Sequence, residues 1–323
     1  MTTETETVLD RRRLRRKMAL WRALAVLALA ITIGVALASR DDFAALFGKK
    51  QIARVTISGT ITEDRDQLRM LKRIAEADNV AGLILFVNSP GGTTTGGEAL
   101  YAALRDVSEK KPVVAQFGTV AASAGYIVGL ATDHIVARGN TITGSVGVLM
   151  QWPEVSGLLN TVGVKMNEVK SGTLKAEPSP FKPADGEALR VAQEMIDDGF
   201  RWFVGLVEER RGVKVTDIPG LREGRIFSGR QALELKLVDE IGGEPEAKLW
   251  LETKRGIDKD LDVVDWKPRD SGADTWLMGS ARNLGRAVVG GGLAGLGEAV
   301  GAAGGLTTLG LDGLVSVWHP AEK

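Results

Sequence analysis

Residues 80–88, VAGLILFVN, restrict the fold most, because they are apolar at almost every position. A strand that is hydrophobic on both sides must be covered on both faces, which is typical of a parallel sheet between layers of helices. Helical patterns on either side of this run, at 63–78 and 98–110, would supply those layers. The chain is therefore predicted to have an α/β fold, with a mostly parallel sheet and helices on its faces. Further strands are expected at 51–61, 112–117 and 134–137.

Ser123 lies where the strand at 112–117 gives way to small, helix-compatible residues. Open parallel sheets bind ligands beyond the carboxyl ends of their strands, so this serine should lie at the functional edge. The first amides of the following helix, those of Ala124 and Gly125, have no intrahelical partner and can stabilise an oxyanion. Ser123 is therefore a candidate nucleophile. The alternative is that it only caps the helix.

A glycine-rich stretch, SPGGTTTGG at 89–97, follows the buried strand and should meet Ser123 at the same edge of the sheet. Successive amides of a Pro-Gly-Gly turn can converge on an anion, and Gly92 is the first candidate donor. The alternative is a tight turn without a catalytic role.

A serine nucleophile needs a base, and the chain has two histidines, His134 and His319. His134 is expected on a short strand and His319 in the terminal tail, which disfavours a Ser-His-Asp triad. Lysine is the other known base for serine when its pKa is lowered. A long proline-containing segment after an expected strand at 164–169 carries the two candidates, Lys170 and Lys175.

The N-terminus carries a basic cluster at 11–17, followed by an almost unbroken apolar run at 18–38. That run has about the length a bilayer requires, roughly 20 residues, and Arg22 near its start can reach the headgroups. The positive-inside rule then places the N-terminus in the cytoplasm and the rest of the chain outside it. The alternative is a signal peptide cleaved near 36–38.

Composition excludes several classes of site. The chain has no cysteine, so disulfides, thiolate nucleophiles and cysteine metal sites are ruled out. Its 41 basic and 41 acidic residues balance, and nothing in the overall charge indicates a nucleic-acid partner.

Four motifs make the chain resemble the signal peptide peptidase A family of membrane-anchored Ser-Lys proteases, in its shorter single-repeat form. They are Asn-Ser-Pro-Gly-Gly at 88–92, Ala-Ala-Ser-x-Gly-Tyr at 121–126, Thr-Gly-Ser-x-Gly-Val at 143–148 and Lys-Ser-Gly-x-x-Lys at 170–175. The resemblance covers roughly residues 51–243. It implies a Clp protease/crotonase-like fold. One position departs from the pattern, since Ala124 stands where many relatives have glycine.

The resemblance also implies roles for individual residues. Ser123 would be the nucleophile, Lys175 its base and Ser145 the residue that orients the lysine amine. The oxyanion hole would use the amides of Gly92 and Ala124. Substrate binding would involve Gly91, Thr93, Val146 and Gly147.

The function implied is degradation of hydrophobic peptides, such as remnant signal peptides, with no metal or cofactor and no nucleic-acid partner. The protein is expected in the cell membrane as a homo-oligomeric ring whose active sites are shared between neighbours. The alternatives are a crotonase-like acyl-CoA enzyme and a non-catalytic membrane scaffold on the same fold.

The expected organisation has five parts. A long amphipathic helix at 184–211 and a closing turn, helix and strand at 224–243 are expected to support the core. The parts are a cytoplasmic tail at 1–17, an anchor at 18–38, a linker at 39–50, a protease domain at 51–266 and a Gly/Ala-rich tail at 267–323.

Overall fold

A computed structural model describes residues 18, 21–22, 48–268 and 315–317. The expected cytoplasmic tail and most of the anchor, linker and C-terminal tail lie outside these residues. Among the residues described, no helix is both long enough and apolar enough to cross a bilayer. The chain divides into two compact units, Met1–Lys50 with Ala77–Asn79 and Gln51–Glu76 with Val80–Lys323. The sheet and the candidate site lie in the second unit.

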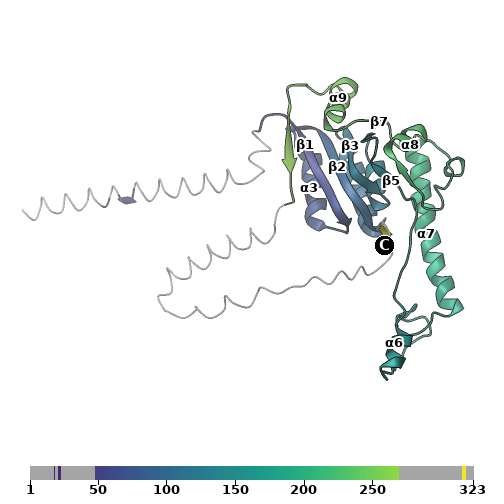
Figure 1. Cartoon of the computed structure of the whole chain (residues 1–323). Helices are drawn as coiled ribbons and strands as arrows, with labels where there is room; N and C mark the ends of the chain where they lie inside the picture. Colours follow the sequence, from purple (N-terminus) through teal and green to yellow (C-terminus); the bar gives the residue numbers. More distant parts are fainter. Residues whose placement is uncertain (1–17, 19–20, 23–47, 269–314, 318–323) are drawn as a thin grey trace, which may run out of the picture. The chain divides into compact units, whose positions relative to one another are not determined.

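The described residues of this unit form an α/β fold around one mixed, mostly parallel sheet (Figure 1). Its main order is β6-β5-β3-β2-β1-β8, with β4 beside β3 and β7 beside β4. The β5–β6 and β2–β9 pairs are antiparallel, and the others are parallel. The strands are β1 (Gln51–Ile61), β2 (Val80–Thr93), β3 (Val113–Ala122), β4 (His134–Ala137), β5 (Ile142–Gly144), β6 (Ile226–Ser228), β7 (Glu240–Ile241), β8 (Asp262–Trp266) and β9 (Val315–Val317).

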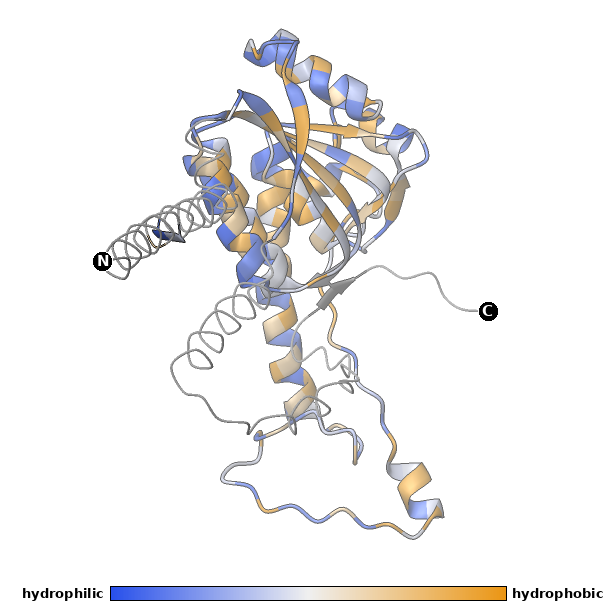
Figure 2. Ribbon diagram, turned by 90° about the vertical axis from the view of Figure 1, so that its left-hand side faces the viewer, coloured by the Kyte–Doolittle hydropathy of each residue, from blue (hydrophilic) through white to orange (hydrophobic). Residues whose placement is uncertain are grey.

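Helices cover both faces of the sheet, as the apolar run at 80–88 predicted. Ile84 packs on one face with Ala247 and Leu251 of α9. Leu83 and Leu85 point to the opposite face and are also fully buried. Figure 2 shows the resulting concentration of apolar residues along the strands. The helices are α3 (Arg65–Glu76), α4 (Thr94–Ser108), α5 (Ala124–Leu130), α6 (Ser156–Thr161), α7 (Gly186–Arg211), α8 (Gly229–Glu234) and α9 (Glu244–Arg255).

Strand β3 pairs with two different strands along its length. Its first half lies beside β4, with Val114 opposite His134. Its second half lies beside β5, with Ala122 opposite Gly144. Because β3 and β5 run parallel and end together, the residues that follow them, Ser123 and Ser145, emerge at the same edge of the sheet.

The prediction of a Pro-Gly-Gly turn at 90–92 is wrong, because strand β2 continues through these residues to Thr93. The pairing register shifts after Val87 in the β2–β3 pair and after Ser58 in the β1–β2 pair. With these shifts, β2 stays paired with both β1 and β3. Gly92 lies so close to β1 that a Cβ atom there would be 1.8 Å from the carbonyl oxygen of Ile61. The glycines therefore serve close strand packing, where the sequence suggested a reversal of the chain.

The strand expected at 164–169 is also absent from the structure. Residues 149–185, hereafter the arm, contain only the short helix α6 and extend from the sheet toward the start of α7 (Figure 1). Val164 and Val169 are exposed, at 45% and 104%. Apolar and β-branched residues form a strand only when another strand pairs with them, and no described strand does so here.

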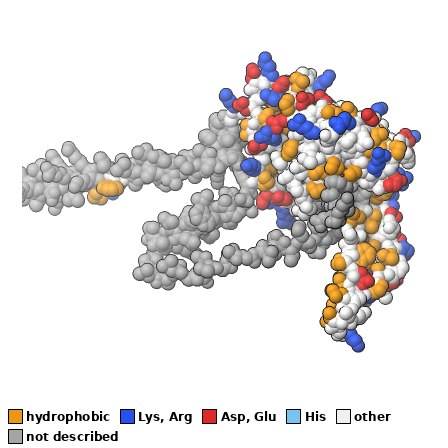
Figure 3. Space-filling view, viewed as in Figure 1, with side chains coloured by type: hydrophobic (Ala, Val, Ile, Leu, Met, Phe, Trp, Pro, Cys, Tyr) orange, Lys and Arg blue, Asp and Glu red, His pale blue; other side chains and the backbone are white. Residues whose placement is uncertain are grey.

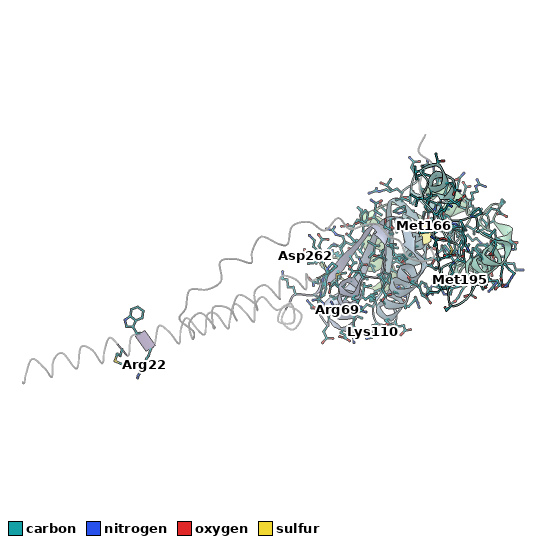
Figure 4. All side chains as sticks on the ribbon, turned by 90° about the horizontal axis from the view of Figure 1, so that it is seen from below. Arg22, Arg69, Lys110, Met166, Met195 and Asp262 are labelled. Atoms are coloured by element: carbon teal, nitrogen blue, oxygen red, sulfur yellow. The ribbon has the colours of Figure 1, made fainter. Side chains whose placement is uncertain are left out.

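The arm and the adjoining part of α7 expose apolar side chains. Met166 of the arm and Met195 of α7 are each about half exposed, and Figure 4 shows both on the side away from Arg69 and Asp262. Figure 3 shows apolar side chains along this projection. The helix expected at 184–211 is confirmed as α7, but only part of its apolar face is buried. The exposed apolar residues of the arm are Leu149, Leu158, Val162, Val164, Met166, Val169, Leu174 and Phe181.

Candidate active site

Ser123 occupies a strained turn between β3 and α5. Its φ of 56° and ψ of −120° form a combination that residues with a side chain rarely adopt. Its backbone amide donates to Gly144 O at 2.9 Å, and its carbonyl accepts from the amides of Tyr126 and Ile127. Its side chain makes no capping hydrogen bond to α5. The capping alternative is therefore excluded, and Ser123 is held in place by its backbone.

The amides of Ala124 and Gly125 precede the first hydrogen-bonded amide of α5, that of Tyr126. Ala124 is fully buried beside Ser123. A Cβ at Gly125 would be 2.8 Å from Ser89 O, so glycine is required there for α5 to approach β2. Tyr126 anchors the same helix, because its hydroxyl donates to Leu237 O at 2.8 Å. Burial raises the pKa of Tyr126, which favours this structural role.

Ser145 also has a positive φ, 53°, and lies directly after β5. Its amide donates to Arg225 O at 3.0 Å, which ties this turn to the segment before β6. Ser123 and Ser145 line one cavity of about 460 Å³. Val146 and Gly147, two of the expected substrate-binding residues, line it as well. The structure thus brings four of the predicted residues together.

The remaining cavity wall comes from segments that the sequence interpretation did not assign to the site. Phe200 and Ile196 of α7 supply an apolar surface, and Arg222 lies over the Phe200 ring at 5.9 Å. The helical periodicity of α7 indicated in the sequence that one face of this helix is apolar. It cannot show which part of the protein that face contacts. The other lining residues are Val148, Leu149, Gln193, Asp197, Glu223 and Gly224.

Gly91, Gly92 and Thr93 do not line this cavity; they form the last residues of β2. Gly92 pairs with Ile61 on one side and with Ser316 of β9 on the other. Figure 1 shows β9 in yellow beside the end of β2. An extended segment is thus bound at the same carboxyl-terminal edge of the sheet at which Ser123 lies.

Asn88 and Ser89 organise this edge. Asn88 Oδ1 accepts from the amides of Thr119 and Val120, at 3.1 and 3.2 Å, where β2 and β3 lose regular register. Ser89 Oγ donates to Gly59 O at 2.6 Å. The sequence interpretation assigned these residues no role. The sequence feature that could have indicated a role is the polar pair itself, which directly follows the apolar run 80–87.

The two candidate lysines have different surroundings. Lys170 Nζ contacts Glu177 Oε1 at 2.5 Å and Glu168 Oε1 at 2.9 Å. The hydrogen bond to Glu177 raises the pKa of Lys170, which makes it a poor proton acceptor. Lys175 is exposed on the arm and has no ion-pair partner among the described residues. It is also absent from the described residues that line the Ser123 cavity.

His134 lies far from Ser123. It starts β4 opposite Val114, nine residues before Ser123 along the parallel strand β3, so the two residues lie toward opposite ends of that strand. Its Nε2 lies 3.1 Å from Glu240 Oε2, and its ring stacks on Trp250 with centroids 4.9 Å apart. His134 therefore has a structural role. His319 lies outside the described residues.

The described residues include no group of three or more histidine, aspartate and glutamate side chains arranged to hold a metal ion. The chemistry that this site can support is carried by the Ser123 hydroxyl, the Ser145 hydroxyl and nearby backbone amides.

Comparisons with known proteins place the chain among peptidases. The model of Peptidase family S49 matches residues 105–258, and the Clp protease model matches residues 40–139. A Synechocystis protein named "Putative protease slr0021" is 38% identical over 246 residues, which cover 73% of this chain and 88% of that protein. "Putative signal peptide peptidase SppA" of Enterococcus faecium is 32% identical, covering 71% and 70%. "Protease 4" of Haemophilus influenzae is 31% identical over 61% of this chain and 34% of its own length.

Proposed function

The chain belongs to peptidase family S49 and is a serine peptidase, and from this premise we propose that it is a membrane-anchored endopeptidase with a Ser123–Lys175 dyad. Its substrates would be hydrophobic peptides such as remnant signal peptides. Membership of a peptidase family favours this function over the acyl-CoA enzyme that shares the fold type. One observation carries the assignment of the nucleophile: Ser123 is held at a strained turn, without capping its helix, in a cavity that it shares with Ser145.

In the proposed reaction, neutral Lys175 accepts the proton of the Ser123 hydroxyl as its oxygen attacks the peptide carbonyl. Buried amides at the start of α5, with that of Ala124 first, would stabilise the oxyanion, together with Gly92 if the end of β2 approaches the substrate. The lysine then donates its proton to the leaving amine, and water hydrolyses the acyl-enzyme. Ser145 would orient the lysine amine by accepting a hydrogen bond from it.

Lys175 would reach this site from a neighbouring subunit of a ring. Two observations support this arrangement. Lys175 is carried by an arm that extends from its own sheet and is absent from the described lining of its own Ser123 cavity. The arm also exposes many apolar side chains, which a second copy of the chain would cover. A head-to-tail interface that closes into a ring would make all sites equivalent.

A peptide would bind in an extended conformation along the end of β2. The pairing of β9 with Gly91–Thr93 supports this mode, because it shows that this edge accepts a strand through main-chain hydrogen bonds. The apolar wall formed by Ile196 and Phe200 would then favour a hydrophobic side chain next to the cleaved bond.

The proposed location is the cell membrane, with the peptidase domain on the exported side. The basic cluster at 11–17 and the apolar run at 18–38 support a single anchor with a cytoplasmic N-terminus. Such an anchor would hold the site close to membrane-derived peptides.

A serine-directed covalent probe tests the proposal, with labelling mapped by mass spectrometry. We expect labelling at Ser123 in the full-length protein and none in Ser123→Ala. Lys175→Ala and Lys175→Arg should each abolish peptidase activity, since a guanidinium stays protonated at any working pH. Lys170→Ala should lose much less. Activity that persists in Lys175→Ala, or labelling only at another serine, would refute the dyad, and complete inactivity of the wild type would favour a scaffold.

A further inference from the structure

A carboxylate that the proposed chemistry does not use is buried in the arm, two residues beyond Lys175. The side chain of Glu177 is 1% exposed, and Ser179 beside it is buried, whereas residues 171–176 are all exposed. It has two cationic partners on one oxygen, because Lys170 and Lys182 contact its Oε1 at 2.5 and 2.6 Å. Its second oxygen accepts from the amide of Ser179 at 3.1 Å. Glu177 thus joins three points of the chain.

These contacts enclose the turn that carries Lys175. The amide of Lys175 donates to Gly172 O at 3.2 Å, and the amide of Glu177 donates to Leu174 O at 3.3 Å. Between them Ala176 has a φ of 62°, a conformation that a residue with a side chain adopts only when its surroundings impose it. The two lysines flanking the turn pair with Glu177, and both also contact the exposed Glu168, at 2.9 and 3.4 Å, so two carboxylates balance two ammonium groups. Lys175 has no ion-pair partner among the described residues.

We infer that Glu177 is a positioning residue, which fixes the Lys175 turn in the geometry needed for proton transfer. This inference rests on the proposed dyad and adds a residue to it. Removing the charge of Glu177 while keeping its size would leave the two ammonium groups with only the exposed Glu168 carboxylate between them, one positive charge in excess. Their repulsion would open the turn, and Lys175 would lose its position without being altered itself.

Glu154 provides a matched control on the same arm. It is also a glutamate, and it accepts a hydrogen bond from the amide two residues on, that of Ser156, at 2.7 Å. It is exposed, and no described lysine or arginine forms an ion pair with it. Glu154→Gln therefore changes the same chemical group at a site where no pair of lysines depends on it.

The experiment measures kcat and KM of the full-length protein on an internally quenched hydrophobic peptide. Glu177→Gln should lower kcat by about ten- to a hundredfold, the cost of a misplaced catalytic group, and leave KM within about twofold. Glu154→Gln should match the wild type. Adding Lys182→Gln to Glu177→Gln should recover part of kcat, because it removes the repulsion; a role in packing alone would not give this rescue.

The outcomes separate this inference from the dyad itself. If Lys175→Ala remains active, the dyad is wrong. If Lys175→Ala is inactive but Glu177→Gln matches Glu154→Gln, the dyad stands and the inference is overturned. A rise in KM at constant kcat also overturns it, because Glu177 would then serve substrate binding. If Glu177→Gln does not fold, Glu177→Asp keeps the charge but cannot reach all its partners, and kcat equal to that of Glu154→Asp would overturn the inference.

Discussion

At the scale of the residue, the site depends on backbone conformations that cost free energy. Ser123 and Ser145 both have positive φ values although neither is glycine. Such strain persists only where surrounding hydrogen bonds impose it, and here the Ser123 amide binds Gly144 O while the Ser145 amide binds Arg225 O. The two hydroxyls are thereby directed into one cavity.

Replacing Ser123 with glycine should reveal this strain. Ser123→Gly and Ser123→Ala both remove the hydroxyl and should both be inactive. The glycine variant should nevertheless be the more stable of the two by about 1 kcal/mol, because glycine adopts this φ and ψ without a steric penalty. Denaturant unfolding of the two variants measures the difference. An alanine variant as stable as the glycine variant would show that the turn is not strained.

The sequence indicated the serine of this turn but not its geometry. Ser123 was recognisable because it follows an apolar strand and precedes small residues. The closeness of Ser145 depends on the pairing of β5 with the second half of β3, a contact between distant segments that no local pattern encodes. The same limit applies to Phe200 and Arg222, whose place in the cavity depends on how α7 packs.

At the scale of the element, the arm differs most from the sequence-based expectation. Its alternating apolar residues suggested a strand at 164–169, but the segment lacks a pairing partner and is organised by charged side chains. The hydrogen bonds from Lys170 and Lys182 lower the pKa of Glu177 to about 2. Strands β1 and β4 matched their expected limits.

The arm should lose order in acid. The pKa of Glu177 is lower in the folded arm than the ordinary 4.5, so its contribution to stability is complete above about pH 4.5 and is lost as the pH falls toward 2. Hydrogen exchange of residues 168–183, corrected for the intrinsic rate at each pH, should show protection falling across that range. Glu177→Gln should show low protection throughout. Equal pH dependence in both proteins would contradict this role for the carboxylate.

At the scale of the whole molecule, the described chain places the proposed nucleophile Ser123 in its cavity and carries the proposed base Lys175 on a projecting arm. The α/β class and the first alternation of strands and helices were predictable from periodicity, since the central strands β2 and β3 carry apolar runs. Periodicity cannot predict the proposed ring, because surfaces that meet in an oligomer follow no repeat within one chain. The exposed apolar side chains of the arm are the structural feature that a ring would explain.

The most direct test mixes two inactive proteins. Ser123→Ala and Lys175→Ala chains are co-expressed, and mixed oligomers are isolated by two different affinity tags. If each site combines the serine of one subunit with the lysine of the next, roughly a quarter of the interfaces are intact and about a quarter of the wild-type peptidase activity returns. A mixture of Ser123→Ala chains with chains that carry both Ser123→Ala and Lys175→Ala should remain inactive, because neither chain has the serine. Stable mixed oligomers of the two single variants without activity would contradict the shared Ser123–Lys175 site.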